Sequence, residues 1–216
     1  MFGISNSLFA FNPVQGIYFG LMGGGSYTPD IDYTTVNPIN NINSDGELVY
    51  FGGGNGGFEL GYRMKNFRIE GQGLFNYNKL ERMQFGNITL PKYNAQFDPT
   101  GINGQTYLLA GFINGFFDCL VENASYAPYI GIGLGQGSVS SEFTFYSANN
   151  LFATVDKSDS VGAYQGIIGL GYHLDDYLFA GLDYRYIRTG KVSTLNSSYV
   201  SQTLNLSLNL TFDLEH

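Results

Sequence analysis

Hydrophobic and polar residues alternate without a break near the end of the chain, over residues 203–212. Because successive side chains of a strand point to opposite faces, this segment presents one apolar face and one small, uncharged polar face. A tilted strand needs about ten residues to cross a bilayer, and this segment has that length. The pattern therefore predicts a membrane-spanning strand whose apolar face is made of Leu204, Leu206, Leu208, Leu210 and Phe212.

Seven earlier segments carry a similar alternation and are predicted to be strands: 16–28, 56–64, 67–77, 105–117, 127–139, 161–172 and 177–188. Short connections, two of them marked by Lys65-Asn66 and Asp175-Asp176, alternate with four long ones: 29–55, 78–104, 140–160 and 189–201. Outer-membrane barrels combine an even number of strands with long outer loops and short periplasmic turns. We therefore predict an all-β fold, an eight-stranded antiparallel up-and-down transmembrane β-barrel whose last strand closes the ring against the first.

The domain organisation follows from this fold. Residues 1–15 are expected to form an N-terminal periplasmic arm, and residues 16–212 the transmembrane β-barrel with its four long outer loops. Residues 213–216 form a tail that resembles part of a purification tag, and no apolar signal segment follows Met1, so we expect that a secretory signal has been removed.

Outward-facing aromatic residues gather at both ends of the predicted strands, with aliphatic residues between them. Aromatic rings prefer the membrane interface, where the body of the ring is apolar and its edge can reach water. A soluble, lipocalin-like ligand barrel is the less favoured alternative, because it needs an apolar interior and a polar exterior. The predicted membrane girdle consists of Tyr27, Tyr62, Phe67, Tyr77, Tyr107, Phe117, Tyr164, Tyr172, Tyr184, Tyr186 and Phe212.

Composition narrows the partners that the chain can have. Of its 216 residues only 13% are charged, and the net charge is −8. An acidic chain without a basic stripe is a poor nucleic-acid binder. The single Cys119 rules out an internal disulfide. No segment approaches 18 consecutive apolar residues, so the sequence predicts no transmembrane helix.

Six charged residues fall on the inward faces of the predicted strands: Glu59, Arg63, Arg68, Glu70, Asp183 and Arg185. Unpaired buried charges cost several kcal/mol each, so we expect a paired, hydrated network in the lumen. Arg63 should face Arg68 across the hairpin, and Glu70 is the expected counter-ion of both. Eight strands leave an interior that side chains can fill, so the favoured interpretation is a plugged barrel. A gated path for small solutes is the alternative.

The sequence supports no catalytic, cofactor or metal site. His173 is followed by Leu174 and Asp175 and lacks the His-then-Ser pattern of outer-membrane lipid A deacylases, so we expect it to be a polar cap at the interface. A lipid-modifying enzyme therefore ranks third among the functions considered. Four acids cluster in the first long connection but match no EF-hand loop, and we expect a solvated acidic loop: Asp30, Asp32, Asp45 and Glu47.

One strand carries a family likeness. The run Ala-Pro-Tyr-Ile-Gly-Ile-Gly-Leu-Gly at 127–135 resembles a strand common in the OmpA-type superfamily of small outer-membrane barrels, especially its opacity-protein and surface-antigen branch. The closing strand, with its terminal aromatic Phe212, is similar to the signal that the outer-membrane assembly machinery reads. The likeness covers the strands, about half of the chain, and not the connections.

The resemblance implies a surface protein in the outer membrane of a Gram-negative bacterium. Its family includes structural anchors, adhesins, immune-evasion antigens and slow pores. We expect an anchor or adhesin, a monomeric barrel whose loops contact host-cell or matrix proteins and whose wall contacts outer-membrane lipids and lipopolysaccharide. The alternative function is a narrow, porin-like channel for small solutes.

Overall fold

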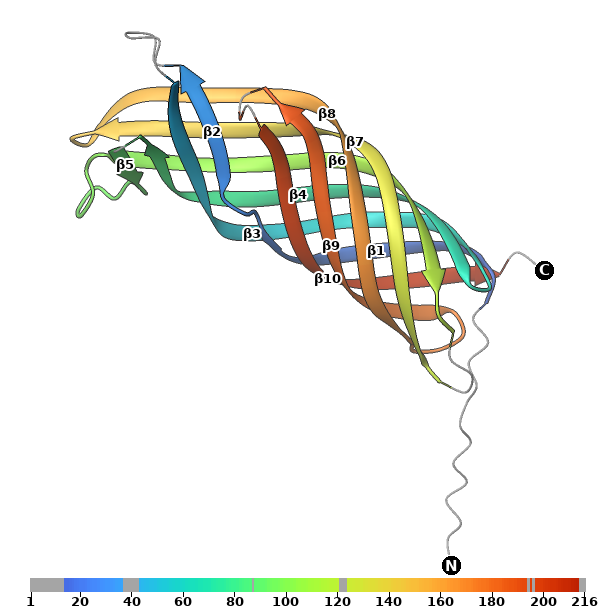
Figure 1. Cartoon of the computed structure of the whole chain (residues 1–216). Helices are drawn as coiled ribbons and strands as arrows, with labels where there is room; N and C mark the ends of the chain where they lie inside the picture. Colours follow the sequence, from blue (N-terminus) through green and yellow to red (C-terminus); the bar gives the residue numbers. More distant parts are fainter. Residues whose placement is uncertain are drawn as a thin grey trace, which may run out of the picture.

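The computed structural model describes residues 14–36, 43–86, 88–120, 124–193, 195 and 197–213, and its regular elements are all strands (Figure 1). Among these residues no helix is long and apolar enough to cross a membrane. Residues 1–13 of the expected arm and residues 214–216 of the expected tail lie outside the described residues. The strands are β1 (Gly16–Tyr27), β2 (Ile31–Val36), β3 (Asn43–Met64), β4 (Phe67–Phe85), β5 (Ile88–Pro91), β6 (Gly101–Asp118), β7 (Tyr126–Ser147), β8 (Asn150–His173), β9 (Leu178–Val192) and β10 (Ser197–Asp213).

Eight of the strands close into an antiparallel ring. The order is β3-β1-β10-β9-β8-β7-β6-β4, and β4 pairs back with β3. The last strand pairs with the first along the whole length of β1, from Gly16 opposite Asp213 to Tyr27 opposite Gln202. Both ends of the described chain lie at the same end of the barrel (Figure 1). The predicted fold class and ring closure are therefore confirmed.

The two short strands lengthen the barrel wall. β2 pairs with the first residues of β3, whereas β1 pairs with the remainder of the same strand, so β2 prolongs the line of β1 after a break at 28–30. In the same way β5 pairs with 82–85 of β4, beyond the stretch that pairs with β6. The wall therefore continues well past the membrane-spanning part of the barrel.

Strands also occupy much of the four connections that we expected to be loops. β7 and β8 form one long hairpin that runs to a turn at Ala148-Asn149, where both residues have positive φ. The reason is visible along β7, whose outward residues change from Ile130 and Ile132 to serines while Val139 becomes a buried inward residue. Alternation continues, but with the polar residues outside, as in a sheet surrounded by water.

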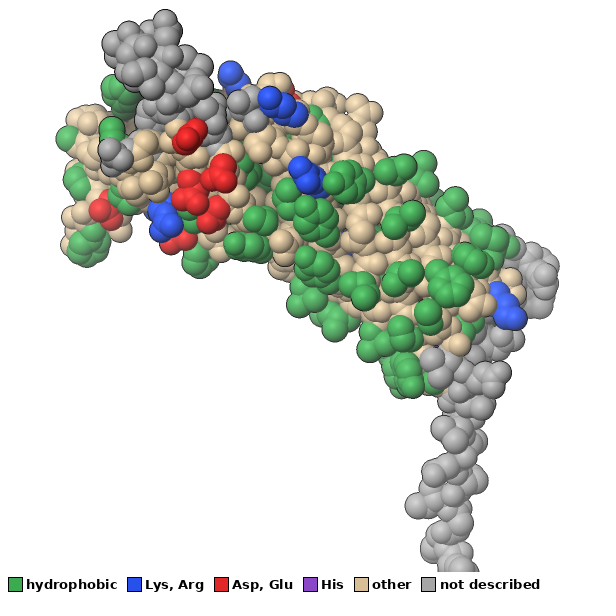
Figure 2. Space-filling view, in the orientation of Figure 1, with side chains coloured by type: hydrophobic (Ala, Val, Ile, Leu, Met, Phe, Trp, Pro, Cys, Tyr) green, Lys and Arg blue, Asp and Glu red, His purple; other side chains and the backbone are tan. Residues whose placement is uncertain are grey.

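The outer wall shows where the lipid lies. Large apolar residues are exposed on the half of the barrel near the termini, as Figure 2 shows, with Ile132 at 76% and Leu206 at 68% of full exposure. The half near the β7–β8 turn carries most of the visible acidic and basic side chains (Figure 2). An apolar belt on the outside of a closed sheet fits a bilayer, since a closed barrel leaves no unpaired backbone edge.

Candidate functional site: a filled lumen and an apolar tip

Arg185, on β9, is the centre of the largest charged group in the lumen. Its guanidinium donates from Nη2 to Oε1 of Glu59 at 2.9 Å and from Nε to Oδ1 of Asp183 at 2.8 Å. The hydroxyl of Tyr129 and the amide of Asn205 donate to the same Asp183 carboxylate, each at 3.0 Å. Four strands are therefore tied together across the interior.

Arg68 forms a second ion pair, with a partner that the sequence pattern did not indicate. Its Nε lies 2.9 Å from Oδ2 of Asp118, and its Nη2 donates to Oδ1 at 2.9 Å. The predicted strand 105–117 stops one residue short of Asp118, which is the last residue of β6 and has a buried side chain. The expectation that Glu70 is the counter-ion is wrong for the described structure, because Glu70 instead accepts hydrogen bonds from Tyr18 (2.8 Å) and Asn114 (2.9 Å).

Arg63 lies opposite Arg68 in the β3–β4 hairpin, at the predicted register. Among the described residues its Nε and Nη2 have no hydrogen-bond partner. The guanidinium instead packs over the rings of Phe179, at 4.5 Å from the centroid, and Tyr18, at 5.9 Å. Cation–π contact therefore offsets part of the cost of burying this charge.

The six sequence-predicted lumen residues all have buried side chains: Glu59, Arg63, Arg68, Glu70, Asp183 and Arg185. Glu59, Asp183 and Arg185 form one ion-paired group, and Arg68 pairs with Asp118. Arg63 and Glu70 take part in neither ion-paired group: Arg63 packs on aromatic rings and Glu70 accepts hydrogen bonds from uncharged side chains. The sequence prediction missed Asp118 because the residues that follow it do not continue the alternation of inward and outward side chains, so the predicted strand ends before it. The only sequence signal for it is its position two residues after Phe116, on the inward face of β6.

The lumen near the β7–β8 turn is apolar instead of charged. A cluster that includes Leu48, Leu80, Ile102, Phe143 and Val192 packs inside the extended wall. Only a few per cent of the surface of each buried residue in this cluster is exposed. Side chains therefore fill this end of the barrel.

Two tyrosines mark the boundary between the charged and apolar parts. The hydroxyl of Tyr50 lies 3.0 Å from that of Thr106, and the hydroxyl of Tyr199 donates to the amide oxygen of Asn76 at 2.9 Å. Burial raises the pKa of Tyr50 and of Tyr199 above the ordinary value of a phenol. Both hydroxyls therefore stay neutral at physiological pH and act as hydrogen-bonding groups of the core.

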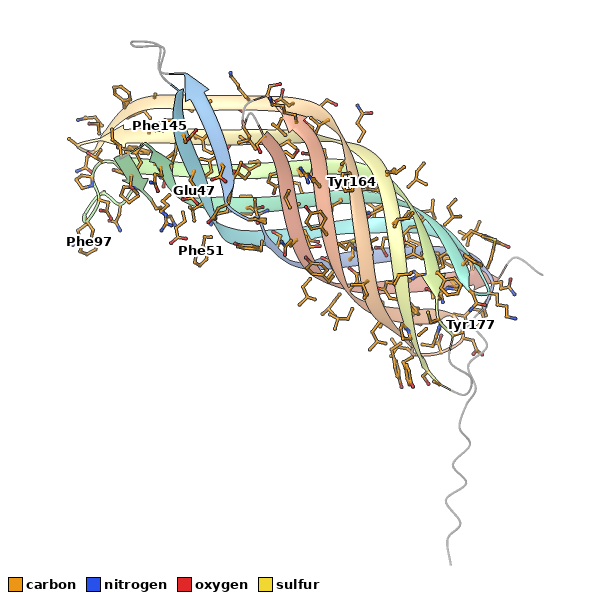
Figure 3. The ribbon with its side chains drawn as sticks, in the orientation of Figure 1. Glu47, Phe51, Phe97, Phe145, Tyr164 and Tyr177 are labelled. Atoms are coloured by element: carbon orange, nitrogen blue, oxygen red, sulfur yellow. The ribbon has the colours of Figure 1, made fainter. Side chains whose placement is uncertain are left out.

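The predicted girdle residues lie on the outer wall, and the larger part of them are exposed, as with Phe67 at 57% and Tyr172 at 52%. Four of them form ring contacts across neighbouring strands: Tyr77 with Tyr107 at 5.2 Å, and Phe67 with Phe117 at 5.2 Å. Figure 3 places Tyr164 and Tyr177 at well-separated levels along the barrel. The full predicted set is Tyr27, Tyr62, Phe67, Tyr77, Tyr107, Phe117, Tyr164, Tyr172, Tyr184, Tyr186 and Phe212.

The remaining candidate chemistry is not assembled into a site. His173 is buried inside the barrel with its ring 5.0 Å from that of Phe179, so the expectation of an interfacial cap is wrong. Cys119 is free and exposed. Within the described ranges no group of three His, Cys, Asp or Glu residues could hold a metal ion.

The end of the barrel away from the termini carries an ordered tip that the sequence pattern did not reveal. The β7–β8 turn is fastened to the segment 92–100: the backbone N–H of Asn149 donates to the carbonyl of Pro99 at 2.9 Å, and that of Ala148 to Thr100 Oγ1 at 3.1 Å. The rings of Tyr93 and Tyr146 stack at 3.8 Å, and Tyr93 donates to Asn149 Oδ1 at 3.2 Å.

Large apolar side chains project from this tip into solvent. Phe97, Leu151 and Phe152 are 75%, 65% and 79% exposed, and Phe97 stands at the extreme end of the molecule in Figure 3. Leu151 pairs across the hairpin with Tyr146, so its side chain extends the surface of the stacked tyrosines. We call Tyr93, Phe97, Tyr146, Leu151 and Phe152 the tip surface.

Comparison with known proteins agrees with this geometry. No family model matches the chain. The crystal structure of Neisserial surface protein A matches with a TM-score of 0.51 and 15% identity, covering 93% of this chain and all (100%) of that one. The outer membrane protein PagN of Salmonella typhimurium is 30% identical over 105 residues, which are 47% of this chain and 44% of PagN, so the match spans less than half of that relative. Together with the closed ring and the apolar belt, these likenesses agree with the expected resemblance: the chain has the fold of the small, eight-stranded β-barrels of the Gram-negative outer membrane.

Proposed function

We propose that this barrel is a non-enzymatic surface protein, an adhesin whose tip surface contacts a protein on a host cell or in the extracellular matrix. The observation that carries the proposal is the exposure of Phe97, Leu151 and Phe152 at the far end of the wall. Soluble protein surfaces seldom expose large apolar side chains together without a binding role. Aromatic and aliphatic anchors of this kind dominate the energy of many protein interfaces.

The construction of the tip supports the same function. A contact surface loses less conformational entropy on binding when it is held rigid beforehand. Here two long strands, β7 and β8, carry the turn outward, and the hydrogen bonds from Ala148 and Asn149 fix it to the segment 92–100. Binding residues are often placed in this way, on connections positioned by a rigid scaffold.

Attachment tests the proposal directly. In a non-adherent Gram-negative strain that displays the barrel, replacing Phe97, Leu151 and Phe152 by Ser should lower binding to epithelial monolayers and immobilised matrix protein at least about tenfold, because interface anchors are removed. Phe51→Ser is the matched control, since Phe51 is 78% exposed but lies on β3, away from the turn. The heat-modifiable gel shift is used to compare strains that carry equal amounts of folded barrel. Undiminished attachment of the triple variant would reject the adhesin function.

We also propose that the lumen is a plug and not a solute path. The ion-paired groups around Arg185 and Arg68 and the apolar cluster around Ile102 support this, since together they fill successive parts of the interior. The refolded protein should therefore show no regular conductance steps in a planar bilayer. Reproducible steps that change when Arg185 is replaced would instead make the lumen a pathway.

A further inference from the structure

A pocket of about 280 Å³ opens on the outer wall between β4, β6 and β7. The polar groups that line it come from Lys79, Lys92, Asn103, Gln105, Glu142 and Thr144. Lys79 and Lys92 are exposed, whereas the other four side chains are half-buried and so held in place by the wall. Leu80 and Gly104 complete the lining, so the pocket borders the apolar cluster of the lumen, and it shares no residue with the tip surface.

Its position relative to the girdle is the first clue to what it binds. Lys79 follows Tyr77 by two residues on β4, and Gln105 precedes Tyr107 by two residues on β6, so each lies one outward position beyond a girdle tyrosine. The Tyr77 hydroxyl donates to Gln105 Oε1 at 3.4 Å, and Lys79 Nζ lies 5.8 Å from the centre of the Tyr77 ring. Because aromatic girdles sit at the headgroup level, the pocket opens where the sugars and phosphates of the outer leaflet lie.

The chemistry of the lining is the second clue. Two ammonium groups occupy the side formed by Lys79 and Lys92, and Glu142 lies on the other side, where its Oε2 accepts a 2.6 Å hydrogen bond from Gln105. Asp156 faces Glu142 across the β7–β8 ladder and adds a second carboxylate on that side. A bare anion would be attracted by one side and repelled by the other.

An acidic sugar satisfies both sides at once. Its phosphate or carboxylate can pair with the lysine ammonium groups, while its hydroxyls donate to the Glu142 carboxylate and bond to the Asn103 amide and the Thr144 hydroxyl. We propose that this pocket binds the phosphorylated or acidic sugar headgroup of the glycolipid that forms the surrounding outer leaflet. The bound glycolipid would hold the extended wall, and with it the tip surface, in a fixed orientation relative to the membrane.

The test uses the refolded full-length barrel in detergent micelles, titrated with fluorescently labelled rough lipopolysaccharide, which is lipid A with its phosphorylated inner-core sugars. Binding by the unmodified protein should saturate. Lys79→Gln combined with Lys92→Gln should raise the Kd about tenfold or more, because two charge-assisted contacts are lost. The matched control is Lys157→Gln combined with Lys191→Gln, which removes two exposed extracellular lysines outside the pocket and should change the Kd less than about twofold.

Three outcomes would overturn the proposal. The first is an unchanged Kd in the pocket variant, or an equal rise of the Kd in the control variant. An equal rise would mean that the effect comes from the net charge of the protein alone. The second is displacement of the glycolipid by phosphatidylglycerol at equal concentration, which would mean that the sugar is not recognised. The third is displacement by inorganic phosphate at similar concentration, which would make the pocket a free-phosphate site. A gel shift confirms that every variant is folded, and attachment through the tip surface is measured separately, so either proposal can fail without the other.

Discussion

Arg185→Leu should lower the free energy of unfolding of this barrel by about 3–5 kcal/mol, the usual cost of breaking a buried ion pair by removing one partner. The replacement leaves the carboxylates of Glu59 and Asp183 buried without the guanidinium that now lies 2.9 and 2.8 Å from them. Repulsion between the two acids adds to the desolvation cost. Urea titration in lipid vesicles, followed by circular dichroism and the gel shift, measures the change.

The matched control for this variant is Arg188→Leu. Arg188 lies three residues further along β9 but is exposed, so the same change of residue type should alter stability by about 0.5 kcal/mol or less. Equal effects at the two positions would show that the Arg185 ion pairs contribute nothing beyond the loss of an arginine. A destabilised Arg185 variant beside an unaffected Arg188 variant would establish the lumen group as a structural tie between strands.

Leu208→Arg is expected to cost about 2–4 kcal/mol, because it places a charge on the lipid-facing wall near the middle of the belt. Leu208 is 50% exposed and alternates along β10 with the buried Ser207 and Asn209. Unfolding in vesicles measures the loss. The control is Gln202→Arg on the same outward face, at the edge of the belt nearer the β7–β8 turn, where the cost of a charge falls to about 0–1 kcal/mol. Equal costs at both depths would contradict the assignment of this wall to the membrane.

The pattern of the sequence was sufficient for the eight spanning strands and for the face on which each residue lies. Side chains on a strand alternate with a period of two, so one unbroken run such as 203–212 determines which of its residues meet lipid. The Lys65-Asn66 turn also determined a register, because a two-residue turn leaves little freedom in how its strands pair, and Arg63 does lie opposite Arg68.

The counter-ion of Arg68 could not be deduced in the same way. Arg68 pairs with Phe116 on β6, which places Asp118 within reach, but β4 and β6 are joined by a long connection that constrains no register. Glu70 is nearer to Arg68 in sequence, yet its carboxylate is directed to Tyr18 and Asn114. Pairing between strands that are distant in sequence depends on the closure of the whole ring.

By itself, the sequence determined an outer-membrane barrel, its spanning strands and the inward position of its charges, because strand geometry is local and the bilayer demands an apolar exterior. The tertiary structure alone decided where the wall ends. Beyond the girdle the alternation reverses, with Val139 and Phe143 buried inside and Ser140 and Glu142 outside, so residues that suggested a loop continue the strand. Only the folded chain then brings the turn at Ala148-Asn149 against Pro99 and Thr100, since these contacts join segments that no local pattern relates.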